Sequence, residues 1–256
     1  MLELPKPQLG NISAITITSP DLEKSLQYYQ QLGFAEVMRF DFPFPWIQVS
    51  DGALLIMLRL DSTPYLALTY YVKEFDEIVI DLEEKGISFI KKPLPTEMLK
   101  RGLFQSPDGL NISLVMIVDG FKQPSGPTML TMKQEDYFKP DTYTNKVCGM
   151  FGELAHPVKN LDDSIAFWQK LGFVVLSKFE SPYPWAIISD GLSIVGLHQT
   201  REFSFPAITF FASDMKERIN KLKEDGLDDF KERGGAGNVV LTTPEQQHIF
   251  LFSLGF

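Results

Sequence analysis

The chain has 256 residues, of which 44% are hydrophobic and 22% charged, a composition that excludes a disordered protein. Its formal net charge is −9, and because an acidic chain repels phosphate backbones we expect no nucleic-acid partner. No apolar run approaches the ~20 residues of a membrane span, and the N-terminal residues lack a signal-peptide pattern. We therefore expect a cytoplasmic protein without a membrane partner, either a monomer or a homodimer.

The sequence contains one unit twice. Asp21-Leu22 matches Asn160-Leu161 and Pro45-Trp46 matches Pro184-Trp185, each time 139 positions later. Further pairs keep this order with small drifts, as expected when loops gain or lose residues. Several collinear matches make chance similarity improbable and indicate a tandem repeat.

In chain order, each copy first predicts a strand and a helix. Period-two alternation indicates strands at Ile12–Thr18 and Glu153–Val158. Apolar residues at helical spacing follow, with Asp21 and Asn160 as suitable N-caps. Three extended runs come next in each copy, and Asp-Gly dipeptides mark tight turns between strands. These runs are Val37–Phe40, Trp46–Ser50 and Leu54–Leu60, then Val174–Phe179, Trp185–Ser189 and Ser193–His198.

The same pattern then begins again within each copy. A strand at Ala67–Val72 or Ala207–Ala212 precedes a second amphipathic helix. Strand-rich tails, Leu103–Ile117 and Val239–Leu254, close the copies. The sequence therefore predicts an α+β protein with an N-terminal module at residues 1–118, a linker at 119–147 and a C-terminal module at 148–256. The linker is rich in Pro, Gly, Thr, Lys and Asp and has little periodicity.

This pattern resembles the vicinal oxygen chelate superfamily, the glyoxalase, bleomycin resistance protein and dioxygenase group. The resemblance rests on the run from Asp21-Leu22 to Leu32-Gly33-Phe34, on Ser106-Pro107-Asp108-Gly109, and on their second-copy counterparts. It implies two tandem βαβββ-type modules, each with a mixed sheet curved into a U-shaped cleft. It says little about activity, because one such scaffold hosts many chemistries.

Family enzymes commonly bind a divalent metal inside the curved sheet, through side chains of the first and last strands of a module. Those positions fall on Ala14 and Ser113 in the first copy, and on Glu153 and Phe250 in the second. Only Glu153 is a good ligand, whereas a catalytic site needs about three N or O donors. We therefore expect no cofactor, and a divalent metal only at an atypical site that includes Glu153.

Glu153 and His248 are the candidate catalytic residues. His248 lies two residues before Phe250, so strand alternation places both on one face, where His248 would share the cleft with Glu153 and act with it as general base and orienter. The plainer alternative is a partly buried histidine with an ordinary hydrogen bond. Alternation places His156 on the opposite face, in a structural role, and His198 is expected at the rim.

Aromatic residues mark the loop after the second strand of each copy. Phe44 and Trp46 in the first copy are echoed by Tyr183 and Trp185 in the second. They would form either a stacking wall for a ligand or a plug that fills the cleft. Together with Ala14, Ser113 and Phe250 they are the candidate pocket residues.

Three functions are compatible with this sequence. The favoured one is a protein that binds a small organic molecule in a cleft without the usual metal, the acidic net charge favouring a cationic ligand. The alternative is a glyoxalase-type lyase or isomerase, or an extradiol-type dioxygenase, with an atypical metal site that includes Glu153. A third is a degenerate copy kept for protein contacts, which would show closed clefts and an exposed apolar patch.

Overall fold

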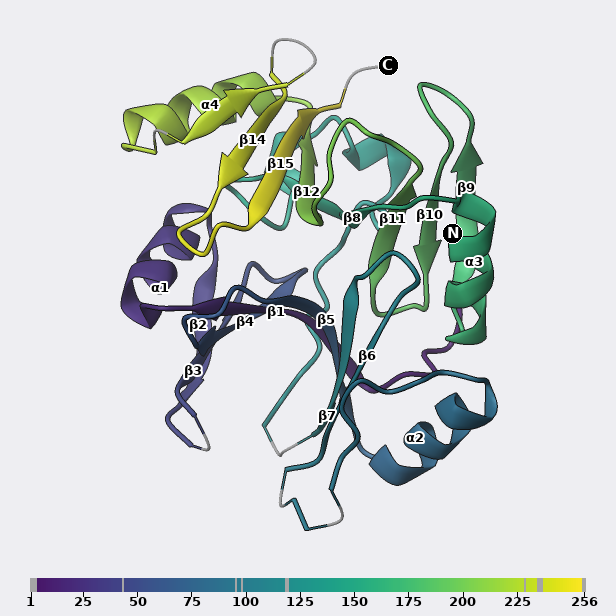
Figure 1. Cartoon of the computed structure of the whole chain (residues 1–256). Coiled ribbons are helices and arrows are strands. Elements are labelled where there is room, and N and C mark those ends of the chain that lie inside the picture. Colours follow the sequence, from purple (N-terminus) through teal and green to yellow (C-terminus); the bar gives the residue numbers. More distant parts are fainter. Residues whose placement is uncertain are drawn as a thin grey trace.

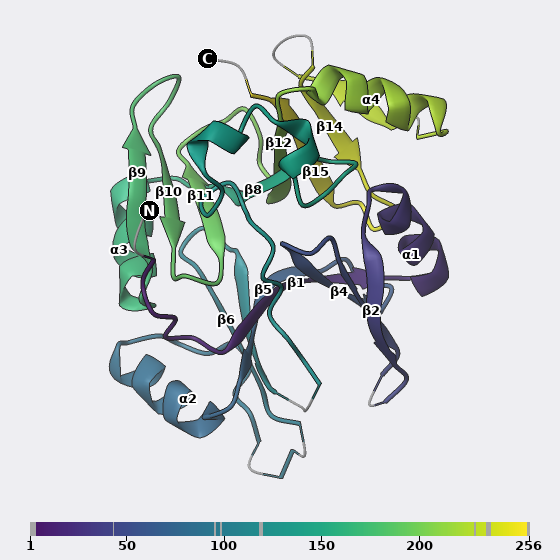
Figure 2. The same cartoon turned by 180° about the vertical axis from the view of Figure 1, so that it is seen from behind.

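A computed structural model describes residues 4–42, 44–94, 96–97, 99–117, 120–227, 229–233 and 237–254. The elements form two β-sheets, one in each half of the sequence, with four longer helices beside them (Figures 1 and 2). Among the described residues, no helix combines the length and the apolar character that a membrane crossing requires.

The first half forms a seven-stranded sheet in the order β2-β3-β4-β1-β5-β7-β6. Its first helix begins where the sequence predicted, because the Asp21 side chain accepts a hydrogen bond from the backbone of Lys24 (3.1 Å). The elements are β1 (Ile12–Ser19), α1 (Leu22–Gln31), β2 (Ala35–Phe40), β3 (Trp46–Ser50), β4 (Leu55–Leu60), β5 (Leu66–Val72), α2 (Phe75–Glu84), β6 (Arg101–Gln105) and β7 (Asn111–Met116).

The second half repeats this arrangement in an eight-stranded sheet, in the order β13-β14-β15-β12-β8-β11-β10-β9. Asn160 caps its first helix through hydrogen bonds from the backbone of Asp162 and Asp163. The elements are β8 (Met150–Pro157), α3 (Leu161–Lys170), β9 (Val174–Phe179), β10 (Trp185–Ser189), β11 (Ile194–His198), β12 (Ala207–Ala212), α4 (Met215–Glu224), β13 (Phe230–Glu232), β14 (Val239–Thr242) and β15 (His248–Ser253).

The predicted α+β class with two tandem modules is confirmed. In both sheets the first strand of the module pairs in parallel with the fourth and antiparallel with the fifth. One detail differs from the predicted pattern. Within the described part of the N-terminal module, the second unit has two strands after its helix and not three, and an isolated bridge between Lys91 and Leu103 lies where β13 lies in the other module.

The two faces of each sheet have different roles because side chains alternate along a strand. On one face, residues of both modules join in a single buried cluster that includes Ile15, Tyr29, Leu154 and Trp168. On the opposite face each module keeps a separate smaller cluster, around Trp46 and Tyr71 in the first and around Phe203 and Phe250 in the second. The two modules therefore share one core, while their cleft faces remain separate.

Two reciprocal contacts fasten the modules together. The Ser25 hydroxyl of α1 donates to the Glu245 carboxylate in the turn between β14 and β15. In the opposite direction, the Ser164 hydroxyl of α3 donates to Asp108 in the turn between β6 and β7, and the backbone of Lys159 donates to the same carboxylate (2.9 Å). The Ser106-Pro107-Asp108 turn and its second-copy counterpart, Thr243-Pro244-Glu245, thus each hold the first helix of the other module.

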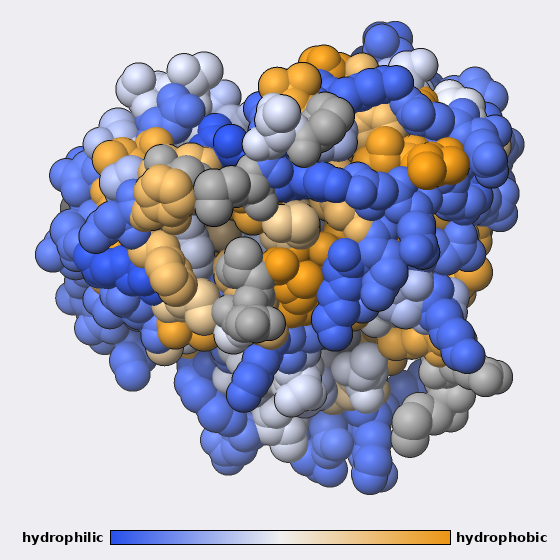
Figure 3. Space-filling view, turned by 90° about the horizontal axis from the view of Figure 1, so that it is seen from below, coloured by the Kyte–Doolittle hydropathy of each residue, from blue (hydrophilic) through white to orange (hydrophobic). Residues whose placement is uncertain are grey.

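The segment between the two sheets contains two short 3-10 turns, Gln134–Asp136 and Pro140–Thr142. The predicted module boundary at residue 118 and the first linker residue, 119, lie outside the described residues, so the module limits stay a prediction. Most of the surface in Figure 3 is hydrophilic, and apolar residues gather near the middle of that face. Exposed apolar side chains include Val37, Phe40 and Phe42 on and after β2.

Candidate functional site

The four positions that the family resemblance implies lie in equivalent rows of the two sheets. Ala14 on β1 pairs with Thr69 on β5, which pairs with Ser113 on β7. Glu153 on β8 pairs in the same way with Thr209 on β12, which pairs with Phe250 on β15. The structure therefore brings Ala14 near Ser113 and Glu153 near Phe250, on the cleft faces.

The cleft of the N-terminal module is filled by its own side chains. Ala14, Trp46, Met57 and Tyr71 form a buried cluster, and the Phe121 ring, from the segment between the sheets, packs on it. The centre of the Phe121 ring lies 4.5 Å from that of Tyr71 and 5.7 Å from that of Trp46. These contacts give the first-copy aromatic residues the role of a plug.

Phe44 belongs to the same plug. Its ring packs against the buried cluster and also contacts two guanidinium groups, those of Arg59 (5.6 Å) and Arg101 (5.0 Å). Two cations against one ring add an electrostatic attraction to the apolar packing. Phe44 therefore seals the outer side of the filled N-terminal cleft.

The cleft of the C-terminal module contains a cavity of about 300 Å³. This volume is at the lower end of the range typical of small-molecule sites. Aromatic, aliphatic and charged side chains share its wall, as they do in most such sites. The lining residues are Glu153, Ala155, Pro182, Tyr183, His198, Glu202, Phe203, Arg233, Phe250 and Phe252.

A buried carboxylate and an imidazole meet in this cavity. Oε1 of Glu153 lies 2.8 Å from Nε2 of His198, and the two residues are 4% and 9% exposed. Nδ1 of His198 lies 3.4 Å from the hydroxyl of Tyr183. Burial, and next the negative charge of Glu153, raise the pKa of Tyr183, so its hydroxyl stays protonated. The three groups form a chain from the sheet to the cavity.

Gly196 makes room for this carboxylate. A Cβ atom added at Gly196 would lie 2.1 Å from Oε2 of Glu153 and 2.6 Å from Oε1, closer than real Cβ contacts allow. The first-copy counterparts of Glu153 and Gly196 are Ala14 and Met57. In both modules one of these two positions holds a large side chain and the other a small residue, but the large side chain is on β4 in the first module and on β8 in the second.

The predicted pairing of Glu153 with His248 is wrong. Glu153 pairs with His198, whereas the His248 ring stacks on Phe205, with 3.6 Å between ring centres. Phe205 also packs toward Phe250 (6.2 Å between ring centres), and neither Phe205 nor His248 is among the residues that line the cavity. The histidine on the strand beside Glu153 reaches the carboxylate, and the histidine two strands away does not.

The expectation that His198 lies at a rim is also wrong. Its ring is enclosed by the parallel ring of Trp185 (5.5 Å between centres, 4° between planes) and by the edge of Phe203 (5.5 Å). The sequence signal for it was Gly196, two residues earlier on the same strand face. A glycine inside a strand often marks a position that another group approaches closely.

Tyr183 and Trp185 therefore contact His198, and they do not fill the C-terminal cleft as their first-copy counterparts fill the N-terminal one. Trp185 also stacks on Phe179 (4.3 Å between ring centres) at the outer side of the sheet. The sequence reasoning missed Arg233, whose guanidinium lies 5.2 Å from the Phe203 ring and 5.1 Å from the Phe250 ring and donates to the backbone oxygen of Glu202. Arg233 directly follows the short strand β13, and nothing in its local sequence indicates that its side chain lines the cavity.

His156 is buried on the opposite face of β8. Burial is the main reason why its pKa is lowered to about 4. The charge of Asp108 raises this pKa by a smaller amount, and His198 lowers it further. His156 is thus neutral near pH 7. Its first-copy counterpart is Ile17, which is fully buried.

The residues present do not fit a divalent metal of the family type. Within the described ranges, no group of three or more His, Cys, Asp or Glu side chains is arranged to hold a metal ion. Glu153 and His198 supply two donors, and Phe250 occupies the position at which the family resemblance implies a further ligand. Two donors are fewer than the three protein ligands of a catalytic divalent site.

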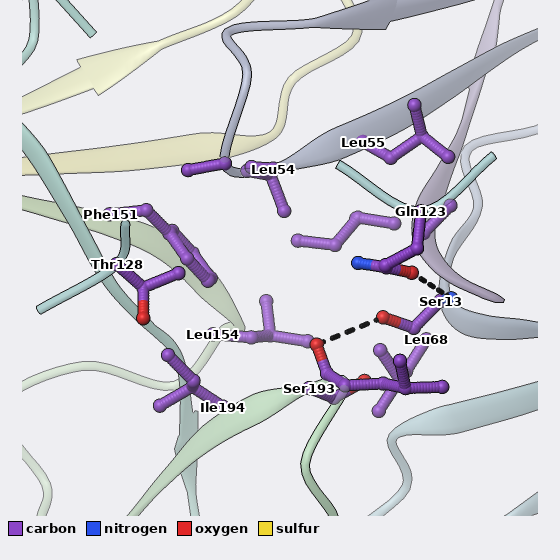
Figure 4. A pocket seen from close by; sticks show the side chains of 14 residues that line it. Ser13, Leu54, Leu55, Leu68, Gln123, Thr128, Phe151, Leu154, Ser193 and Ile194 are labelled. Atoms are coloured by element: carbon purple, nitrogen blue, oxygen red, sulfur yellow. Dashed lines mark hydrogen bonds between the residues drawn. The ribbon is translucent and has the colours of Figure 1, made fainter. Parts of the chain in front are cut away.

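A second, much smaller cavity of about 30 Å³ lies between the modules (Figure 4). Beside it, the backbone of Ser13 donates to Gln123 (2.8 Å) and the Ser13 hydroxyl donates to the carbonyl oxygen of Leu192 (3.2 Å). Apolar residues such as Leu54 and Phe151 form most of the rest of its wall. The volume suits roughly one or two water molecules, so this cavity is part of the packing between the modules.

Comparison with known proteins agrees with this architecture. Residues 11–114 match the model of the Glyoxalase/Bleomycin resistance protein/Dioxygenase superfamily. No curated protein matches the sequence significantly.

Solved structures extend the likeness to the whole chain. Homoprotocatechuate 2,3-dioxygenase from Arthrobacter globiformis aligns with a TM-score of 0.62 and 15% identity, over 100% of this chain and 83% of that one. The 2,3-dioxygenase LapB from Pseudomonas sp. KL28 aligns with a TM-score of 0.60 and 14% identity, over 99% of this chain and 94% of that one. At such identities the likeness concerns the fold. The match over residues 11–114 agrees with the family resemblance of the sequence, and the whole chain has the fold of these 2,3-dioxygenases.

Proposed function

We propose that this protein binds a small organic molecule in the cleft of its C-terminal module, without a divalent metal of the family type. The observation that carries the proposal is the difference between the two clefts. The N-terminal cleft is packed with Trp46, Tyr71 and Phe121, whereas the C-terminal cleft contains a cavity of about 300 Å³. Polar groups converge on that cavity from several separate segments.

The chemistry of the wall indicates the kind of ligand. Phe203, Phe250 and Phe252 present apolar surface suited to a flat, mostly apolar molecule. Arg233 is held in place by its two cation–π contacts and its hydrogen bond to Glu202. A guanidinium at the wall favours a ligand with an acceptor oxygen, so the acidic net charge of the chain is a poor guide to this site.

Ligand binding is testable through Trp185, because this indole stacks on His198 beside the cavity. We expect small planar oxygen-containing molecules to quench its fluorescence and to raise the melting temperature. Both effects should persist in excess EDTA. Trp185→Phe should lose the fluorescence response but keep the thermal shift. A panel without any thermal shift, or shifts that Arg233→Gln and Phe250→Ala leave unaltered, would contradict the proposed site.

The alternative is a metal-dependent lyase, isomerase or dioxygenase with Glu153 among its ligands. The shared fold of the 2,3-dioxygenases and the position of Glu153 on the first strand of its module favour it. The donor set does not support it, because among the described residues only His198 joins Glu153. Metal analysis of the purified protein decides the point: stoichiometric Fe, Mn, Ni or Zn that is lost in Glu153→Ala would overturn the metal-free proposal.

A further inference from the structure

The hydrogen bond between Glu153 and His198 determines which imidazole nitrogen is free. Glu153 Oε1 faces Nε2 at 2.8 Å. With the Glu153 oxygen as the acceptor of this hydrogen bond, Nε2 carries the hydrogen and Nδ1 keeps its lone pair. The free lone pair therefore lies on the side of the ring that faces away from the sheet and toward Tyr183.

Nδ1 of His198 has one long contact, with Tyr183, beside the cavity. The Tyr183 hydroxyl is 3.4 Å from Nδ1, longer than the 2.5–3.0 Å usual for a hydroxyl donor, so this contact is weak. His198 lines the cavity, and Trp185 and Phe203 hold its ring in one orientation. A molecule in the cavity would meet a fixed nitrogen base whose ring faces are covered by apolar groups.

Among the described residues, titratable or charged groups lie on several sides of His198. Glu153 lies beneath it on β8, Glu202 and Arg233 line the same cavity, and His156 lies on the other face of β8. Glu153 would stabilise the imidazolium that forms when Nδ1 takes up a proton. Arg233 and Tyr183 are the donors available to an oxygen of the ligand.

We propose that the C-terminal cleft carries out metal-independent proton abstraction from a carbon atom of the bound molecule, with Nδ1 of His198 as the base. This inference rests on the proposed function, since it requires a ligand in the same cavity. The C–H bond breaks, its proton forms an N–H bond at Nδ1, and the electron pair moves to an electron-withdrawing oxygen of the ligand. The substrate class is a small planar carbon acid, and return of the proton to another atom yields an isomer without an oxidant or reductant.

The test uses 5-nitrobenzisoxazole, a planar uncharged carbon acid. A base that removes its ring C–H proton breaks the N–O bond and releases a coloured nitrile-bearing phenolate, with no need for a metal or a cofactor. With the full chain in EDTA, we expect release at least about 100-fold faster than with the same concentration of free imidazole. His198→Gln should reduce the rate to that of free imidazole. His248→Gln is the matched control, and it should keep the full rate because Phe205 covers that ring.

Glu153 is a positioning residue in this scheme, so its variant needs a readout beyond the rate. In Glu153→Gln we expect a lower kcat with little change in KM, and a shifted pH profile, because the amide no longer stabilises the imidazolium. Nitrogen-15 NMR of the unliganded protein should show the hydrogen on Nε2 in the wild type and a mixture of tautomers in the variant. This measurement stays informative if His198→Gln fails to fold.

The outcomes separate the two proposals. Quenching of Trp185 by the probe without phenolate release overturns the proton-abstraction inference and leaves the binding site in place. If the probe causes neither quenching nor phenolate release, both the binding proposal and the proton-abstraction proposal are contradicted. Release that persists in His198→Gln, or a wild-type spectrum with the hydrogen on Nδ1, overturns the role of His198.

Discussion

The two clefts of this protein share a scaffold and differ in what fills them. At equivalent positions the N-terminal cleft has Ala14 and Met57, and the C-terminal cleft has Glu153 and Gly196. In the first, sulphur and aromatic rings close the space, and the Tyr71 hydroxyl donates to Met57 (3.2 Å). In the second, a carboxylate occupies the volume that a side chain at position 196 would need. A buried charge persists only where a partner and space are both provided, here His198 and a glycine.

The largest effect is expected from Gly196→Met, which introduces the first-copy residue against an unchanged Glu153 side chain. The new side chain would overlap the carboxylate and force it away from His198. Overpacking and the loss of a buried charge partner together should cost about 4 kcal/mol of unfolding free energy. Urea denaturation measures this loss.

Glu153→Ala/Gly196→Met is the matching double variant, because it recreates the pair found in the N-terminal cleft. It should recover about 2 kcal/mol relative to Gly196→Met alone. Additive single and double effects would show that the two positions do not exchange volume, so that the two clefts do not differ by a swap of large and small residues.

The second prediction concerns His156 and its counterpart Ile17. The pKa of His156 in the folded chain, about 4, lies below its unfolded value of 6.5. Between these pH values the unfolded chain binds the extra proton, so stability is fully present above pH 6.5 and is lost as the pH falls toward 4. The loss should reach about 3 kcal/mol at pH 4.

His156→Ile copies the N-terminal residue and should remove this pH dependence. Denaturation midpoints at pH 7 and pH 4.5 provide the measurement. His248→Gln serves as the control, because the pKa of half-buried His248 is lowered by burial and by Lys231 without the same degree of enclosure. An unchanged slope in His156→Ile would mean that other groups cause the acid sensitivity.

Removing the Phe121 ring should open the filled N-terminal cleft. Phe121→Ala removes the ring that covers Tyr71 and Trp46 and should cost about 2 kcal/mol, less than a fully buried phenylalanine because Phe121 is half-buried. An apolar cavity left in this way binds apolar molecules, so indole should raise the melting temperature of the variant. Phe179→Ala, at the exposed outer side of the other sheet, should cost less than half as much and gain no response to indole.

The sequence alone predicted the fold but only part of the candidate site. Caps such as Asp21 and Asn160 and period-two strands are local signals, so the elements and their order could be read directly. Strand alternation also placed Ala14, Ser113, Glu153 and Phe250 on cleft faces. The partner of Glu153 could not be read, because it depends on strand neighbours: β11 lies beside β8, whereas β15 is separated from it by β12.

Arg233 and Phe121 escaped prediction for a related reason. Both lie outside the helices and strands that the repeat defines, and both reach their clefts from irregular segments. The repeat shows what the two modules share. The residues that distinguish their clefts come from the segments that the repeat does not constrain.

The smallest effects are expected at the two contacts that join the modules. Ser25→Ala leaves the Glu245 carboxylate, which is 4% exposed, without its hydroxyl donor and should cost about 2 kcal/mol. Ser164→Ala should cost about 1 kcal/mol or less, because Asp108 is only half-buried and keeps the hydrogen bond from the backbone of Lys159. Denaturation of both variants tests the order. If Ser164→Ala proves the more damaging, the burial of the acceptor does not control the strength of these contacts, and the reciprocal contacts are not equivalent in the way that the repeat implies.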